Sequence, residues 1–184
     1  MTVNDKNLKN VYIIDKNGNK RRIKRVYIGV NGNAKKIADT ILTVSRHYKT
    51  ATPLSQARRN LSATSIGNYA LFGGGYASSY SDVVDAYDIS LVRTTPTPLS
   101  QARRNLSATS IGDYALFGGG DGPSAVVDAY DTSLVRTTPT PLSKARTSLA
   151  STSIGDYALF GGGYDSSSVA YDVVDAYSVQ KILI

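Results

Sequence analysis

Short apolar strands separated by glycine and proline recur through the last three quarters of the chain. In the first stretch, 61–66 is a strand of small residues that ends at the turn Gly67-Asn68, and 69–72 is an apolar strand that ends at three glycines. Residues 83–88 alternate as a third strand, and 91–95 form a fourth that ends before prolines 96 and 98. No segment has the spacing of an amphipathic helix. The pattern therefore predicts an all-β fold.

The same order of strands occurs three times. The letters ALFGGG stand at 70–75, 115–120 and 158–163. A unit of about 45 residues is the length of one four-stranded propeller blade. We therefore expect three blades, at about 53–97, 98–140 and 141–184, each with four strands.

Three blades are fewer than the four to eight that closed propellers typically have, and the open edges would expose unpaired backbone groups. A second copy of the chain would complete a six-bladed ring, so each chain is expected to be half of it. We predict a homodimer, or another symmetric oligomer. Two segments are candidates for the strand that joins the copies: 48–55, whose letters copy the end of a blade, and 180–184.

The first 47 residues differ in chemistry from the repeats. The letters NVYIIDKNGNKRRI (10–23) are echoed by RVYIGVNGNAKKI (25–37), and both patterns predict a β-hairpin with an Asn-Gly turn. Residues 1–50 hold 12 Lys or Arg against 3 Asp, whereas residues 51–184 hold 9 against 11. We therefore expect a basic hairpin module at 1–47 and the repeats at 48–184.

The repeats resemble the kelch repeat. Its marks are a glycine pair that closes an apolar strand, a tyrosine a short loop later, and an arginine before the first strand. The chain departs from the family at its usual tryptophan, because it contains no Trp and Leu91-Val92-Arg93 stands near that place. The residues that match, and for which the resemblance implies a structural role, are Gly73, Gly74, Gly118, Gly119, Gly161, Gly162, Tyr87, Tyr130, Tyr177, Arg58, Arg103 and Arg146.

These repeated residues also have a physical interpretation. The glycines allow a backbone conformation or a close approach between blades that a Cβ would forbid. We expect the arginines to hold loop carbonyls or an aspartate between blades. The repeated aspartates Asp85, Asp128 and Asp175 are expected to be hydrogen-bonded turn or interblade groups.

The N-terminal module is similar to the short VYIGVNG modules at the start of structural proteins of phages and prophages of Gram-positive bacteria. This resemblance implies a virion or tail component, made in the host cytoplasm because no signal peptide is apparent. The hairpins would attach it to other virion proteins through Tyr12, Arg21, Arg22, Tyr27, Lys35 and Lys36. We favour docking or a solvated edge over contact of this basic cluster with nucleic-acid phosphates. No apolar run approaches the length of a membrane span.

Ligand binding is expected where the units differ most, in the loops after the glycines. These loops read YASSYSD (76–82), DGPSA (121–125) and YDSSSVAYD (164–172). Their composition is typical of adaptable contact surfaces, and the expected ligand is a host-surface glycan or a neighbouring virion protein. The alternative is that exposed loops vary without binding anything. The predicted binding residues are Tyr76, Tyr80, Asp82, Asp121, Tyr164, Asp165 and Tyr171, with Arg59 and Arg104 at the same face.

Composition argues against an enzyme. The chain has one His, no Cys and no Glu, which is too little for a thiolate or multi-histidine metal site. It therefore lacks the ligands of the copper oxidases known among kelch-like propellers. A glycosidase needs two carboxylates about 5 to 10 Å apart, and the variable loops offer Asp121, Asp165 and Asp172. We predict a protein without metal or cofactor; the alternatives are a cellular kelch interaction module and a glycan-degrading enzyme.

Overall fold

The computed structural model of the chain describes residues 11–14, 20–23, 29–30, 33–34 and 51–180. Contacts within the chain separate two units, Met1–Tyr48 and Lys49–Ile184. In the first unit, β1 (Val11–Ile14) pairs with β2 (Lys20–Ile23), and β3 (Gly29–Val30) pairs with β4 (Asn33–Ala34), both antiparallel. The two pairs coincide with the two predicted Asn-Gly hairpins.

The predicted attachment residues fall partly on these strands. Tyr12 lies on β1 opposite Arg22 of β2, and Arg21 is also on β2. Tyr27, Lys35 and Lys36 lie outside the described residues. Their role in attachment stays a prediction.

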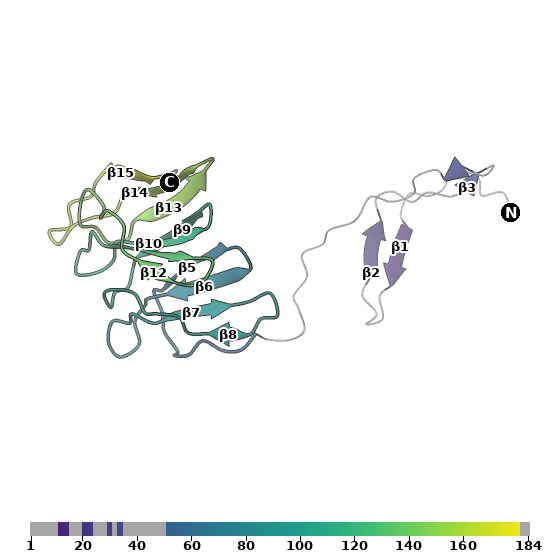
Figure 1. Cartoon of the computed structure of the whole chain (residues 1–184), viewed down its shortest axis with the longest axis horizontal. Helices are drawn as coiled ribbons and strands as arrows, with labels where there is room; N and C mark the ends of the chain where they lie inside the picture. Colours follow the sequence, from purple (N-terminus) through teal and green to yellow (C-terminus); the bar gives the residue numbers. More distant parts are fainter. Residues whose placement is uncertain (1–10, 15–19, 24–28, 31–32, 35–50, 181–184) are drawn as a thin grey trace, which may run out of the picture. The chain divides into compact units, whose positions relative to one another are not determined.

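The second unit consists of three antiparallel sheets, each made of strands that follow one another in the chain (Figure 1). We call the sheets, with their loops, blade 1, blade 2 and blade 3. Blade 1 contains β5 (Ser62–Ile66), β6 (Tyr69–Gly73), β7 (Val84–Tyr87) and β8 (Arg93–Thr94). Blade 2 contains β9 (Ser107–Ile111), β10 (Tyr114–Gly118), β11 (Val127–Asp131) and β12 (Arg136–Thr137). Blade 3 contains β13 (Ala150–Ile154), β14 (Tyr157–Gly161) and β15 (Val174–Tyr177).

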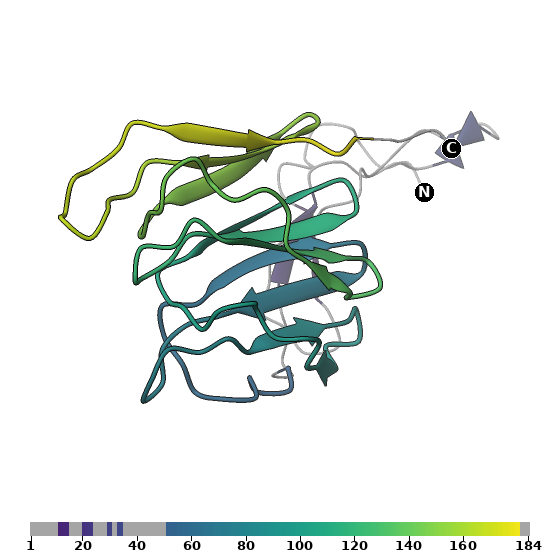
Figure 2. The ribbon, with the colours of Figure 1, turned by 60° about the vertical axis from the view of Figure 1, so that its left-hand side comes forward.

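The all-β prediction is confirmed, and the sheets lie in series like the blades of a propeller (Figure 2). Blade 3 has three strands in the part of the chain that the structure describes. Its fourth-strand candidate, 180–184, lies outside the described residues except for position 180. The part of 48–55 that corresponds to β8 also lies outside them, so the strand that joins two copies stays a prediction.

The fourth strand of blade 1 is shorter than predicted. Leu91 is not in a strand, because it has a positive φ of 62° and belongs to the turn that precedes β8. The Asp88 carboxylate accepts hydrogen bonds from the backbone N–H groups of Ser90 and Val92, at 2.8 and 3.0 Å. Such a local bond offers the backbone an alternative to the sheet.

Aromatic rings pack on the glycines that end the apolar strands of the preceding blade. The ring of Phe117 in blade 2 lies on Gly73 in blade 1, and the ring of Phe160 in blade 3 lies on Gly118 in blade 2. A Cβ on either glycine would come within 2.8 Å of the ring, and both rings are completely buried. The glycines therefore let neighbouring sheets approach closely, as the sequence predicts.

Backbone hydrogen bonds repeat at both interfaces between blades. The donors and acceptors at the two interfaces occupy equivalent positions in the repeat. From blade 1 to blade 2 the pairs are Gly75 N–H to Arg103 O (2.9 Å), Leu99 N–H to Asp82 O (2.8 Å), Arg103 N–H to Ser81 O (3.1 Å) and Asn105 N–H to Asn60 O (3.0 Å). From blade 2 to blade 3 they are Gly120 N–H to Arg146 O (2.9 Å), Leu142 N–H to Ala125 O (2.8 Å), Arg146 N–H to Ser124 O (3.1 Å) and Ser148 N–H to Asn105 O (2.9 Å).

Candidate ligand-binding loops

A buried arginine fixes the start of each variable loop. In blade 1, Arg58 donates to the carbonyl oxygens of Gly74 and Phe72, at 2.8 and 3.0 Å, and its guanidinium lies 2.8 Å from the Asp85 carboxylate. The side chains of Arg58 and Asp85 are fully buried. Since Gly74 directly precedes the loop that begins at Tyr76, this pair sets the direction in which the loop leaves the sheet.

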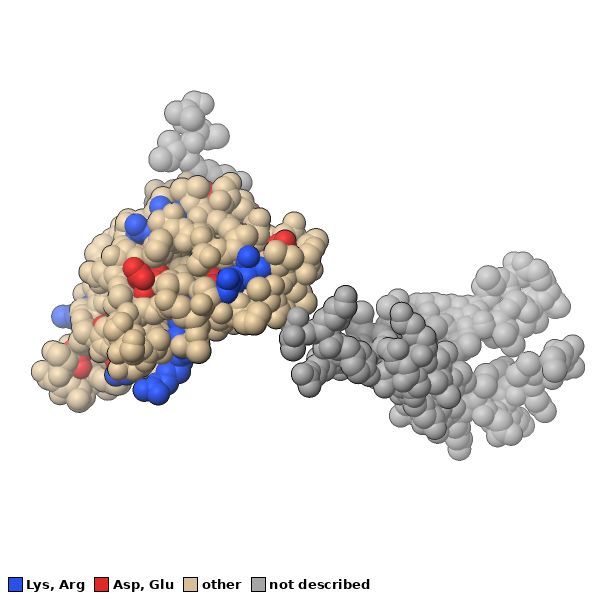
Figure 3. All heavy atoms as spheres, turned by 90° about the horizontal axis from the view of Figure 1, so that it is seen from below, with Lys and Arg blue, Asp and Glu red and all other residues tan. Residues whose placement is uncertain are grey.

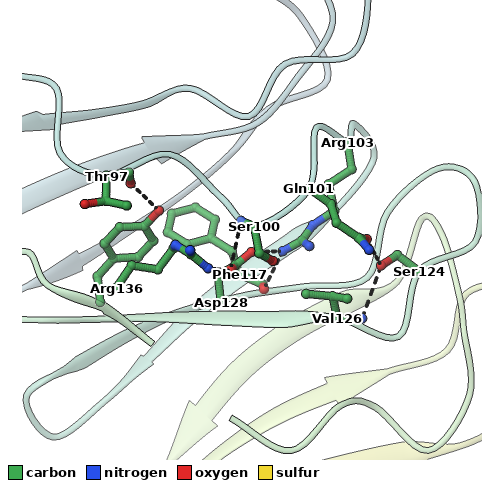
Figure 4. Close-up of polar contacts among 10 residues, drawn as sticks. Thr97, Ser100, Gln101, Arg103, Phe117, Ser124, Val126, Asp128 and Arg136 are labelled. Atoms are coloured by element: carbon green, nitrogen blue, oxygen red, sulfur yellow. Dashed lines mark hydrogen bonds and ion pairs between the residues drawn. The ribbon is translucent and has the colours of Figure 1, made fainter. Parts of the chain in front are cut away.

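The same pair in blade 2 belongs to a larger network (Figure 4). Arg103 and Arg136 approach Asp128 from opposite sides, at 2.7 and 2.9 Å, and the backbone N–H of Ser100 donates to the same carboxylate. Burial lowers the pKa of the Arg103 guanidinium, and the neighbouring Asp128 counteracts this shift. Because Ser100 belongs to the link between blades, the aspartate also ties that link to the sheet.

Blade 3 repeats this arrangement with a less buried aspartate, since the Asp175 side chain is 16% exposed. Arg146 contacts the Asp175 carboxylate and donates to the carbonyl oxygens of Gly162 and Val173 at 2.8 and 2.9 Å. All three arginines thus bind backbone carbonyls and an aspartate of their own blade. The sequence-based expectation of an aspartate between blades is therefore replaced by an ion pair within each blade.

The repeated tyrosines connect each sheet to the link that enters it. The hydroxyl of Tyr130 donates to Thr97 O at 2.8 Å, and that of Tyr177 donates to Thr140 O at 3.0 Å. Burial, with a smaller contribution from Asp175, raises the pKa of Tyr177 to about 12. These hydroxyls therefore stay protonated and act as hydrogen-bond donors at neutral pH. In blade 1, Tyr87 packs edge-to-face on Phe72.

Two arginines and two tyrosines form a cluster between the loops of blades 1 and 2. The Tyr76 ring lies between two guanidinium groups, with its centroid 5.2 Å from Arg59 and 5.1 Å from Arg104. Arg104 also lies 5.3 Å from the centroid of Tyr80, whose ring meets Tyr76 edge-on at 6.1 Å. We call Arg59, Tyr76, Tyr80 and Arg104 the Arg–Tyr cluster. Two of the four residues are exposed, Arg59 and Tyr80, and Tyr80 has 40% of its surface accessible.

Asp121 of blade 2 holds one side of this cluster in place. Its carboxylate accepts hydrogen bonds from Arg104 Nε at 2.5 Å, Thr147 Oγ1 at 2.7 Å and Asn105 Nδ2 at 3.1 Å. Burial favours the protonated form of this carboxyl, but the bonds from Thr147, Arg104 and Asn105 outweigh burial and lower the pKa of Asp121. The group is therefore an ionised acceptor and is unsuited to be a general acid.

The loop of blade 3 is organised by its own aspartate. Asp165 accepts hydrogen bonds from the backbone N–H groups of Ser167 and Val169 and, at 2.9 Å, from the hydroxyl of Tyr171. The bond from the Val169 backbone and the one from Tyr171 lower the pKa of Asp165. Tyr164 is joined to this blade through backbone pairing with Thr147. Thr147 connects Tyr164 to the loop of blade 2, because its hydroxyl donates to Asp121.

The structure thus joins the Arg–Tyr cluster to Asp121 and, through Thr147, connects Asp121 to Tyr164. Asp165 and Tyr171 pair with each other in the loop of blade 3. One predicted residue is placed elsewhere. Asp82 belongs to the interface between blades, where its carbonyl oxygen accepts the N–H of Leu99. Thr147 and Asn105 are contacts that the sequence analysis missed. A signal was present for Thr147, since it occupies the position in the third unit that Arg59 and Arg104 occupy in the first two.

Charge is spread thinly over one face of the blades. Figure 3 shows one face of the molecule, on which the basic and acidic side chains of the blades form small separate groups among other residues. Among the described residues, no group of three His, Asp, Glu or Cys side chains is placed to hold a metal ion. In the same part of the chain, there is no helix of the length and hydropathy needed to cross a membrane.

Comparison with known proteins identifies the fold. No protein-family model and no curated protein matches the chain. Among solved structures, the chain is similar to YjhT, a β-propeller, with a TM-score of 0.63 and 16% sequence identity. The similarity covers 73% of this chain and 46% of YjhT, so this chain spans about half the length of that protein. At this identity the similarity shows a β-propeller-like fold and nothing about activity.

Proposed function

We propose that this protein is a non-enzymatic structural component of a phage virion, with a kelch-like propeller that binds a glycan on the host surface. The observation that carries the binding role is the Arg–Tyr cluster, in which exposed aromatic and guanidinium groups are held on loops of a rigid scaffold. The virion role is supported by the resemblance of the N-terminal module to phage structural proteins. Residues 1–47 would attach the protein to other virion proteins.

The chemistry of the Arg–Tyr cluster suits a saccharide. Tyrosine rings offer flat apolar area at a low cost in side-chain entropy. Planar guanidinium groups offer several hydrogen-bond donors in a fixed geometry. Arg104 is already engaged by Asp121, whereas Arg59 contacts no carboxylate among the described residues. Arg59 and Tyr80 are therefore the groups most available to a ligand.

Binding to bacterial envelopes tests this proposal. The full chain, labelled with a fluorophore, would be incubated with purified cell walls from a panel of Gram-positive bacteria, and the bound fraction measured. We expect binding to at least one wall type, and a loss of roughly 10-fold or more in affinity for Arg59→Ala/Tyr80→Ala, as is usual when central contacts are removed.

A matched control is available in the same fold. Tyr114→Ala removes a tyrosine that is 37% exposed, nearly the exposure of Tyr80, but at the opposite end of a blade from the loops. It should bind as the unaltered chain does. Absence of binding to every wall, or equal losses in both variants, would refute the binding role. Release of reducing sugars from the walls would instead favour the glycan-degrading alternative.

A further inference from the structure

The outer flank of blade 3 exposes apolar residues that the other blades bury. Val174 is 59% exposed, whereas the equivalent valines of blades 1 and 2, Val84 and Val127, are completely buried. Ile154 is 69% exposed, whereas its two equivalents are at most 7% exposed. In blades 1 and 2 these positions are covered by the next blade. The flank of blade 3 therefore carries the surface of a blade interface without the blade that covers it.

The same flank contains an open glycine site. A Cβ added at Gly161 would meet one side chain within 4 Å, Val174 at 3.4 Å. At the equivalent Gly73 and Gly118, an aromatic ring of the next blade fills this space. At Gly162, a Cβ would meet only a backbone oxygen at 3.9 Å, whereas the equivalent glycines are covered by a leucine. Blade 3 thus has room for one more phenylalanine and one more leucine.

Blade 1 presents these two side chains on the opposite flank of the array. Phe72 and Leu61 occupy the repeat positions of Phe117 and Leu106, which enter the glycine sites of blade 1. Phe117 is completely buried and Leu106 is 7% exposed, but Phe72 and Leu61 are only partly buried. The two flanks of the array therefore have complementary shapes.

The backbone groups of the two flanks are complementary as well. Each internal interface has four backbone hydrogen bonds, and the repeat assigns the same four bonds to a third interface. Among residues 51–180, the groups that would form these four bonds on the outer flanks of blades 1 and 3 make no such bond between blades. The expected pairs, with the blade 3 group first, are Gly163 N–H with Arg58 O, Asp172 O with Leu54 N–H, Tyr171 O with Arg58 N–H, and Ser148 O with Asn60 N–H.

We propose that blade 3 of one chain packs against blade 1 of a second copy, so that two chains close a six-bladed ring. The interface is head-to-tail, and such an interface forms a ring when its rotation closes. Closure by two copies agrees with the span of the chain, which covers 46% of the β-propeller YjhT. The observations that carry this inference lie on the flanks and do not depend on what the loops bind.

Ring closure also completes the loop surface. At the interface of blades 1 and 2, Arg104 lies beside Tyr76 of the preceding blade. Arg59 and Tyr164 occupy the same repeat positions as Arg104 and Tyr76. In the ring, Arg59 of the second copy therefore lies beside Tyr164. Each boundary between the two copies then contributes an arginine–tyrosine contact to the same face.

The mass of the full chain in solution tests the proposal. Native mass spectrometry and light scattering at tens of micromolar are expected to give twice the 19.6 kDa of one chain. Gly161→Val should raise the dissociation constant by roughly 30-fold or more, the effect of losing a central contact. This variant should still fold, because Gly161 does not have a positive φ and a Cβ there would make only an ordinary contact, with Val174 at 3.4 Å. Circular dichroism checks its folding.

A control and a second variant make the test specific. Ser166→Val adds bulk in an exposed loop of blade 3 and should leave the dimer intact.

The second variant, Leu61→Asp, places a charge on the flank of blade 1 and should also prevent dimer formation. When it is mixed with Gly161→Val, one intact pair of flanks remains, so a mixed dimer should form. An interface that used the same flank on both copies could not recover in this way.

Three outcomes would overturn the closed two-chain ring. The first is a monomer of the unaltered chain at these concentrations, which would leave the flanks for another partner or for further blades of a longer polypeptide. The second is an assembly of three or more chains. The third is a dimer that persists unchanged in Gly161→Val, which would place the contact elsewhere on the molecule.

Discussion

Arg103 and Asp128 form an ion pair of 2.7 Å in which both side chains are almost completely buried. The partners are separated by 25 residues, and Arg103 also donates to the backbone oxygen of Phe117. This contact joins the segment before the first strand of blade 2 to its second and third strands. Equivalent pairs occur in blades 1 and 3.

Removal of Arg103 is expected to destabilise the protein strongly. Arg103→Met leaves the Asp128 carboxylate buried and partly unpaired, which costs about 3–5 kcal/mol in the free energy of unfolding. Arg136→Met removes the second arginine at the same carboxylate, but its side chain is 23% exposed, so the expected loss is about 1 kcal/mol. Urea unfolding at fixed protein concentration measures both. Equal losses would show that burial of Arg103 is not the deciding factor.

The double variant Arg103→Met/Asp128→Leu tests the reason for that loss. If the cost comes from an uncompensated buried charge, removal of both charges should recover part of the stability. A double variant less stable than Arg103→Met would show instead that the aspartate's bonds to Ser100 and Arg136 dominate.

A methyl group at Gly73 should destabilise the interface between blades 1 and 2. Because the Cβ of Gly73→Ala would lie 2.8 Å from the Phe117 ring, we expect a loss of about 1–3 kcal/mol. Phe117→Leu has a smaller, movable side chain, so the cost of Gly73→Ala should be lower in that background. A double-mutant cycle from thermal or urea unfolding measures the coupling. Additive effects would contradict the proposed contact.

The stabilising contribution of Asp121 should depend on pH. The folded-state pKa of this carboxyl lies below its ordinary value of 3.8. Its stabilisation is therefore fully present well above pH 3.8 and is lost as the pH falls through the folded-state pKa. At pH 7, Asp121→Asn should lower the free energy of unfolding by about 1.5–3 kcal/mol, as for hydrogen bonds to a charged group. The difference from the unaltered chain should shrink below pH 3.8; a difference independent of pH would argue against this account.

A glycine at position 148 should stabilise blade 3. Ser148 has a positive φ of 55° and is exposed, and non-glycine residues adopt this conformation at a cost of about 1–2 kcal/mol. Ser148→Gly removes that cost but adds freedom to the unfolded chain, so we expect a gain of about 0.5–1 kcal/mol. Ser78→Gly, in an exposed loop without positive φ, is the control and should give no gain. The midpoint of thermal unfolding reports both.

Local features of the blades could be predicted from the sequence, whereas contacts between loops could not. The strands β6 and β7 lie where apolar and β-branched residues alternate between glycines, because local patterning decides strand formation. Leu91 was assigned wrongly to a strand, since its place depends on the hydrogen bonds of Asp88 to the turn. The contact of Tyr76 with Arg104 joins residues of two different units, and the pattern within one unit carries no information about it.

The sequence by itself determined that this protein is built from β-blades, where their strands lie, and that glycines mark the close approaches. These properties depend on residue spacing and backbone freedom, which are local. Only the tertiary structure decided which arginine meets which aspartate, that Thr147 and Asn105 support Asp121, and which flank of each end blade is left exposed. These relationships depend on the distance and relative orientation of neighbouring sheets, because hydrogen bonds and ring contacts act over only a few ångströms.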